Sequence, residues 1–239
     1  MTAAWKLAAE ARLMDPVTPI VLKTNAVEMI ATSSLSKPPS RATFNRWLQD
    51  LVASRKLRPV TKGIYINRLG HRDASPAAAA HWIRSRSIVS LAWVLEQAGV
   101  TNNLGDTITC VIPIDVTWPS PQISDRSTAA GTFRFFAMPA HLTDERAGRL
   151  ADLRDLRFDY PRATAEKALL DWLYLGASAR SRMTRPPMDL EIESLDRRRL
   201  KRLAKSMKLT DLLDPWMQDR ARYQASAEVR GNASKLLGL

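Results

Sequence analysis

The stretch that decides the fold is Arg41–Asn67, RATFNRWLQDLVASRKLRPVTKGIYIN. In its first half Phe44, Trp47, Leu48 and Leu51 recur at helical spacing, which predicts a helix over Arg41–Ser54 with one buried side and a polar opposite side. In its second half two β-prone runs, Leu57–Val60 and Ile64–Asn67, flank Thr61-Lys62-Gly63 and predict a hairpin.

The residues before this stretch complete a recognisable order of elements. Two further helices are predicted over residues 3–14 and 20–31, and the Ser- and Pro-rich run TSSLSKPPS over residues 32–40 predicts a polar turn that ends on Ser40, a residue suited to cap a helix. Two helices, a turn, an amphipathic helix and a hairpin are the order of a winged helix-turn-helix, so residues 1–72 are predicted to form a DNA-binding domain.

In such a domain the start of the third helix meets base edges and the hairpin tip meets phosphate. The alternative is that these polar side chains are only the solvated face of a surface helix. The predicted DNA-binding residues are Lys37, Ser40, Arg41, Thr43, Asn45, Arg46 and Lys62, with Arg55 and Arg58 as outer phosphate contacts.

The charge distribution favours the DNA-binding alternative. The 239 residues carry a formal net charge of +12. Residues 1–72 hold 12 Lys+Arg and 4 Asp+Glu, residues 73–177 hold 10 and 12, and residues 178–239 hold 14 and 8. A basic head and a basic tail therefore flank a nearly neutral middle, which predicts an anionic partner.

Composition excludes several other classes. With a single cysteine, Cys110, the chain cannot hold a disulfide framework or a cysteine-rich zinc site, and a reducing compartment is expected. No apolar run approaches the roughly 20 residues that span a bilayer, and the N-terminus is a poor signal peptide. A cytoplasmic location without a membrane partner is expected.

Residues 73–239 predict a mixed helical domain with a small β-sheet, which makes the whole chain α+β. Helices are predicted from Pro76 to Arg86, over residues 90–98 and over residues 162–175, where Gly176 is expected to end the helix. Strands at residues 107–113 and 132–138 are expected to pair across the Pro- and Ser-rich run 117–128. Residues 211–223 are predicted to be helical, with a break near Asp214-Pro215.

A helix over residues 196–208 predicts a second basic surface, which is a solvated face, a DNA contact or a docking surface for another partner. Its basic residues are Arg197, Arg198, Arg199, Lys201, Arg202 and Lys205.

The chain lacks the patterns of common enzymes. Neither a phosphate-cradling glycine loop nor a GxSxG nucleophile turn occurs, and Cys110 lies in an apolar run typical of a buried thiol. Asp189, Glu191 and Glu193 alternate, so on a strand they would share one face as metal ligands do. They also precede an Arg-rich helix, and a salt-linked helix entry is the simpler interpretation. We therefore expect no catalytic residue, no metal and no cofactor.

Four stretches together resemble the AbiEi-type antitoxins of type IV toxin–antitoxin systems. These stretches are Phe44–Asn67, Ser75–Thr101, the strand pair near Thr107 and Phe133, and Thr164–Gly176, which contains the pattern EKALLD (Glu166–Asp171). The resemblance implies a transcriptional repressor that binds inverted repeats in its own promoter and counters a nucleotidyltransferase-like toxin. It covers residues 20–176, so the basic tail lies outside it.

Two other functions remain open from the residues alone. One is a nucleic-acid-binding accessory protein that uses head and tail as a clamp. The other is a metal-dependent nucleic-acid-processing enzyme that uses the cluster from Asp189 to Glu193.

Overall fold

The computed structural model describes residues 4–33, 35, 37–71, 74–102, 105–115, 124–144 and 146–236, with side chains up to residue 226. The chain forms two compact units. The first unit contains Met1–Ser85 and Arg126–Phe133, and the second contains Arg86–Asp125 and Arg134–Leu239. The expected boundary after residue 72 thus differs from this division, because the segment up to Ser85 packs with the first unit.

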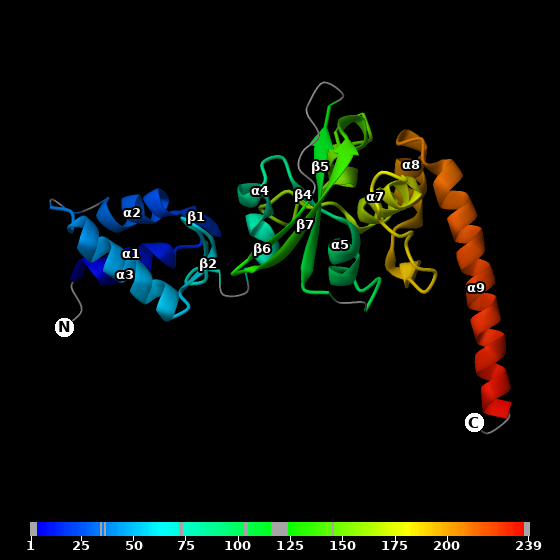
Figure 1. Ribbon diagram of the computed structural model, residues 1–239, viewed down its shortest axis with the longest axis horizontal. Coiled ribbons are helices and arrows are strands. Elements are labelled where there is room, and N and C mark those ends of the chain that lie inside the picture. The colour runs from blue at the N-terminus through cyan, green and yellow to red at the C-terminus, as the bar shows by residue number, and fades with distance from the viewer. Residues whose placement is uncertain are drawn as a thin grey trace. The chain divides into compact units, whose positions relative to one another are not determined.

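The first unit is built from three helices and a three-stranded sheet. Its elements are α1 (Ala4–Leu13), β1 (Val21–Lys23), α2 (Thr24–Thr32), α3 (Arg41–Ala53), β2 (Leu57–Thr61), β3 (Ile64–Asn67), the 3₁₀ turn η1 (Pro76–Ala79) and α4 (Ala80–Ile83). The sheet has the order β1-β3-β2, with both pairs antiparallel. Figure 1 shows α1, α2 and α3 together, with β1 and β2 at one end of the helices.

The core of the first unit contains the apolar stripe of the deciding stretch. Phe44, Trp47, Leu48 and Leu51 of α3 are all buried. The ring of Trp5 from α1 meets Trp47 edge-on, with 5.2 Å between ring centroids. Aromatic pairs prefer this edge-to-face arrangement, so α3 is fixed against α1 with its polar side outward.

The expected helix over residues 20–31 is partly wrong. Its first residues form β1, in which Val21 pairs with Ile66 and Leu22 with Tyr65 of β3. Only Thr24–Thr32 is helical. The apolar residues in this region satisfy a helical pattern locally, but backbone pairing with the distant strand β3 outweighs that preference.

The second unit combines a four-stranded sheet with helices, so the chain as a whole is mixed α and β. Its elements are β4 (Ile88–Val89), α5 (Leu91–Gln97), β5 (Thr107–Ile114), β6 (Asp125–Thr128), β7 (Gly131–Pro139), η2 (Ala140–Leu142), α6 (Leu150–Leu153), α7 (Ala165–Ala177), η3 (Ile192–Ser194), α8 (Arg197–Ser206) and α9 (Thr210–Leu236). The sheet has the order β4-β5-β7-β6, which confirms the expected neighbours at residues 107–113 and 132–138.

Three expected boundaries in this part of the chain differ from the structure. The helix after Ser75 is short and ends at Ile83. In the run 117–128, the last four residues lie in β6, while residues 117–123 lie outside the described residues. Pro215 lies inside α9 and does not break it.

Gly176 does not end α7, which continues to Ala177. A Cβ atom at this position would lie 2.8 Å from Cα of Arg185. The glycine is therefore required by the close approach of a neighbouring backbone, not by a helix terminus. Of the helices in the described part of the chain, none is both long and apolar enough to cross a membrane.

Candidate nucleic-acid interface

The first two turns of α3 present a continuous polar surface. Ser40 caps the helix, because its Oγ accepts a hydrogen bond from the backbone N–H of Thr43 at 3.2 Å. The two hydroxyl oxygens also lie 2.9 Å apart. Thr43, Asn45 and Arg46 are exposed. The cap that begins the helix thus also places the predicted base-reading side chains on its outer face.

Arg41 is already engaged within the unit. It forms an ion pair with Glu28 of α2 and lies over the Phe44 ring, 5.7 Å from its centroid. This pair joins α2 to the start of α3. The guanidinium group of Arg46, by contrast, makes no hydrogen bond or ion pair with any residue that the structure describes.

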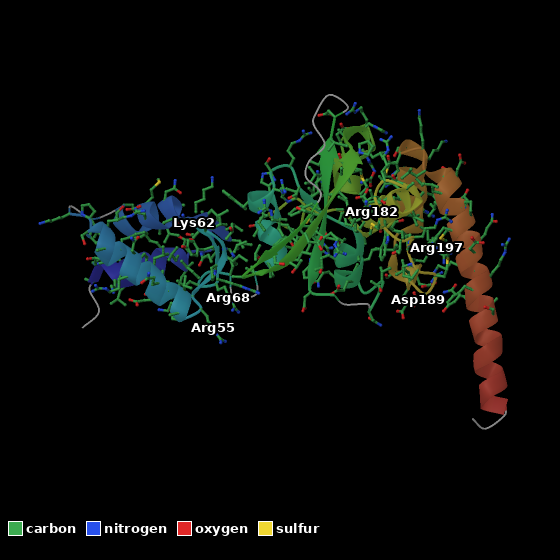
Figure 2. The ribbon with its side chains drawn as sticks, viewed as in Figure 1. Arg55, Lys62, Arg68, Arg182, Asp189 and Arg197 are labelled. Carbon is green, nitrogen blue, oxygen red and sulfur yellow. The ribbon has the colours of Figure 1, made fainter. Side chains whose placement is uncertain are left out.

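Lys62 lies at the tip of the β2–β3 hairpin (Figure 2). Gly63 beside it adopts φ +77°, and its carbonyl accepts a hydrogen bond from the backbone N–H of Thr24 at 3.0 Å. The tip is therefore fixed to the start of α2. Lys62 is exposed, and within the described ranges nothing pairs with its ammonium group.

Arg55 and Arg58, the predicted outer phosphate contacts, do not lie at the hairpin tip beside Lys62. Thr61 pairs with Ile64 at the tip, and Leu57 pairs with Asn67 at the opposite end of the hairpin. Arg55 lies at that opposite end, beyond the last residue of α3 (Figure 2). A helix of 13 residues is about 20 Å long. Arg55 is thus about 20 Å from the start of α3, on which the other predicted contacts are concentrated.

Arg58 is half-buried, and its Nη2 donates to the carbonyl of Ala130 at 3.4 Å. Lys37 is exposed just before α3. The nine predicted residues therefore form a cluster at the start of α3, a separate hairpin tip, and a pair at the hairpin base. Arg68, which the sequence analysis does not name, also lies at this base, since its N–H donates to the Lys56 carbonyl at 2.9 Å.

Two arginines of the second predicted basic surface, on α8, hold this helix against the rest of the second unit. Asp196 caps α8, and its carboxylate accepts hydrogen bonds from the N–H groups of Arg198 and Arg199. Arg202 donates to Asp152 at 2.7 Å, and Arg199 donates to Glu166 at 3.4 Å. These hydrogen bonds hold α8 against α6 and α7 through two buried carboxylates.

The hydrogen bonds from Arg202 and Arg149 keep the pKa of Asp152 below its usual range. The other four basic residues of the predicted surface are exposed, and their side-chain cations have no partner within the described part of the chain. They are Arg197, Arg198, Lys201 and Lys205.

The carboxylates proposed as metal ligands do not form a metal site. Ile192–Ser194 is a 3₁₀ turn, so this described segment does not form the strand that would be needed to align Asp189, Glu191 and Glu193 on one face. Glu193 accepts a hydrogen bond from Nη2 of Arg220 in α9 at 2.8 Å, and this contact lowers the pKa of Glu193. Across the described residues, no group of three potential ligands could hold a metal ion.

The EKALLD pattern contributes a buried polar network. Lys167 and Asp171 form an ion pair one turn apart in α7, and Ser90 Oγ donates to Asp171 at 2.7 Å. All three residues are buried. This network joins α7 to the start of α5, which gives the EKALLD pattern a structural role.

Cys110 is buried as the sequence predicts, and burial raises the pKa of its thiol.

Comparisons with known proteins add little. No protein-family model matches the chain, and neither does any curated protein. Among solved structures, the chain is similar to the RV2827C protein from Mycobacterium tuberculosis, with 16% sequence identity and a TM-score of 0.48. The likeness covers 90% of this chain and 78% of that chain. We infer neither fold nor function from a likeness of this degree.

Proposed function

We propose that the protein is a DNA-binding transcriptional autorepressor and the antitoxin of a type IV toxin–antitoxin system, and that it is not an enzyme. In this proposal the first unit is a winged helix-turn-helix, with α3 in the major groove and the β2–β3 hairpin as its wing. The order α1-β1-α2-α3-β2-β3, with β1 paired to β3, supports that assignment.

The observation that carries the proposal is the exposed start of α3. Its capped first turns present Thr43, Asn45 and Arg46 outward, while Phe44 and Trp47 hold the opposite face in the core. Asn and Arg are side chains that read adenine and guanine edges in the major groove. Lys62 on the wing supplies a phosphate contact near the start of α2.

The antitoxin role rests on the family resemblance of residues 20–176. It implies a nucleotidyltransferase-like toxin as the partner in function and inverted repeats in the promoter as the DNA target. A DNA target also implies a cytoplasmic location. The exposed basic residues of α8 offer a further surface for DNA or for another anionic partner.

Titration of the full chain against a fluorescent duplex from its own upstream region tests DNA binding. The double variant Arg46→Ala/Lys62→Ala should bind at least about 10-fold more weakly, because the loss of one base contact alone costs about 1–3 kcal/mol and the loss of a phosphate contact adds to it. If both residues contact phosphate, the slope of log K against log salt should also fall in magnitude by about 2.

A matched control removes the same charge elsewhere. Arg180 and Arg182 are exposed residues of the second unit, and Arg180→Ala/Arg182→Ala should change the affinity less than threefold. Unchanged affinity and slope in Arg46→Ala/Lys62→Ala would refute the winged-helix assignment. Equal losses in both double variants would indicate nonspecific attraction by net charge.

Co-expression tests the antitoxin role separately. The chain should restore growth to cells that express a nucleotidyltransferase encoded beside it. Absence of such a gene, or continued growth arrest when both proteins are produced, would refute the antitoxin role without affecting the DNA-binding result.

A further inference from the structure

The second unit contains a cavity of about 970 Å³. Its wall is formed by α5, the segment from Ala151 to Ala165, the start of α7, and residues 194–199. A volume of this size lies at the upper end of the range that small-molecule sites occupy. Every lining residue belongs to the second unit, so the cavity is independent of the DNA interface proposed above.

Four arginines line this cavity, against two carboxylates. The arginines are Arg154, Arg157, Arg162 and Arg199, and the carboxylates are Asp155 and Glu166. Both carboxylates already have partners. Asp155 accepts two hydrogen bonds from Arg157 at 2.9 and 2.8 Å, and Glu166 accepts from the Asp196 N–H at 2.9 Å and from Arg199. The remaining charge of the wall is positive.

Three of these arginines hold buried nitrogen atoms without a hydrogen-bond acceptor. Arg162 is only 6% exposed, and its Nε has no hydrogen-bond partner in the described part of the chain. Nη1 of Arg154 and Nε of Arg199 also lack a hydrogen-bond acceptor among the described residues, although Nε of Arg199 forms an ion pair with Asp152 Oδ1 at 3.7 Å. An unpaired buried donor is costly, and native structures usually pair such groups with protein, water or a ligand.

Besides the arginines, the cavity wall contains an aromatic ring, apolar side chains and the N-terminus of a helix. The guanidinium group of Arg162 lies over the Phe158 ring, 4.2 Å from its centroid, so the ring holds the guanidinium group in place. Val94, Leu156 and Leu195 add apolar surface. Thr164 caps α7 at the cavity wall, which brings the positive end of a 13-residue helix to the same site.

We propose that this cavity binds a nucleotide, with its phosphate accepting hydrogen bonds from Arg162, Arg154 and Arg199 and its base on the apolar part of the wall. Guanidinium groups match phosphate oxygens in geometry as well as charge. The phosphate supplies the acceptors that these buried donors lack. The apolar residues explain why a nucleotide, larger than inorganic phosphate, fits the site.

Isothermal titration of the full chain with AMP and ATP tests this inference, with adenosine and inorganic phosphate as the partial ligands. Both nucleotides should bind at least tenfold more tightly than adenosine, because adenosine offers no anion to the arginines. Arg162→Gln should weaken nucleotide binding about tenfold or more, since one charge-assisted hydrogen bond corresponds to about that factor.

The matched control is Arg197→Gln. Arg197 is exposed on α8 and does not line the cavity, so its loss should change nucleotide affinity less than twofold. Ala151→Trp provides a variant that keeps every charge, because Ala151 is an exposed residue of the cavity wall. The indole should fill part of the cavity and reduce nucleotide affinity about tenfold while the melting temperature stays unchanged.

If Arg162→Gln fails to fold, Ala151→Trp decides the question, since that position is exposed. Absence of nucleotide binding at millimolar concentration would overturn the proposal. Equal losses in Arg162→Gln and Arg197→Gln would overturn it as well. A duplex oligonucleotide whose binding depends on Arg162, without any binding of free nucleotide, would assign the site to nucleic-acid phosphate and overturn the nucleotide proposal.

Discussion

The ion pair between Lys167 and Asp171 gives a prediction whose size follows from the structure. The two residues are 3% and 0% exposed, and Asp171 also accepts a hydrogen bond from Ser90 at 2.7 Å. In Asp171→Asn, the amide keeps an acceptor for Ser90 but removes the negative charge beside Lys167. The variant therefore leaves a buried ammonium group without its counter-ion, and it also removes the attraction between Asp171 and the half-buried Arg154.

That cost has an upper limit, because Lys167 can give up its proton. The ordinary pKa of the group is 10.5, and each unit between 10.5 and the working pH costs about 1.4 kcal/mol. The limit is about 5 kcal/mol at pH 7 and about 2 kcal/mol at pH 9. Removing one partner of a buried pair typically costs about 3–5 kcal/mol. We therefore expect a loss of about 3–5 kcal/mol at pH 7 and of about 2 kcal/mol or less at pH 9.

The sign of the pH dependence follows from linkage. Burial lowers the pKa of Lys167, and Asp171 opposes that effect. Without Asp171 the folded-state pKa falls further below that of the unfolded chain. Between the two values the unfolded state binds more protons, so the free energy of unfolding rises with pH, and it rises more steeply in the variant.

Urea unfolding at pH 7 and pH 9, followed by far-UV circular dichroism, measures these differences. Lys167→Met/Asp171→Asn removes both charges of the ion pair, so it should recover at least half of the stability lost in Asp171→Asn. A loss below about 1 kcal/mol at pH 7, a loss that does not change between pH 7 and pH 9, or a double variant no better than the single one would refute this reasoning.

Three further variants test other parts of the structure by urea unfolding. Ser40→Ala removes the cap of α3 and should cost about 1 kcal/mol; no change in the urea midpoint would count against the capping role. Gly63→Ala should cost about 1–3 kcal/mol, because Gly63 adopts φ +77° and the new Cβ lies 3.3 Å from Thr24 Oγ1; a stabilised variant would contradict this geometry. Asp152→Asn should cost about 1 kcal/mol at pH 7, since the arginines that pair with Asp152 are partly exposed. Because Arg202 and Arg149 lower the pKa of Asp152, its contribution is present above about pH 4 and is lost as the pH falls through the folded-state value, so the gap between the two urea midpoints should narrow progressively below about pH 4; a gap that does not narrow would refute the pairing.

The elements that the sequence predicts correctly are those held by strong local signals. The apolar stripe of α3, its Ser40 cap and the Gly63 turn each need only neighbours within a few residues, and the structure has α3 and the hairpin where they are expected. Val21–Lys23 could not be predicted in this way, because its strand exists only through pairing with Ile64–Ile66, more than 40 residues further along the chain.

In the candidate site too, the features that depend on local spacing could be predicted, whereas those that depend on contacts between distant segments could not. Exposure of Asn45 and Arg46 follows from the spacing of the buried residues Phe44 and Trp47 on either side of them. The engagement of Arg41 by Glu28, and of Arg58 by the Ala130 carbonyl, depends on contacts between distant segments. The arginine cavity was not anticipated for the same reason, since its donors come from separate elements and carry no motif at a fixed spacing.

The sequence alone therefore determined the polar faces, the caps and the sign of the charge, because these depend on residue type and short spacing. Tertiary structure decided which charges stay available. Of the six basic residues predicted for the second surface, Arg199 and Arg202 are bound to buried carboxylates of α6 and α7, while Arg197, Arg198, Lys201 and Lys205 are exposed. A charge can be counted from the sequence, but its partner is fixed only when distant segments pack together and exclude water from the carboxylates between them.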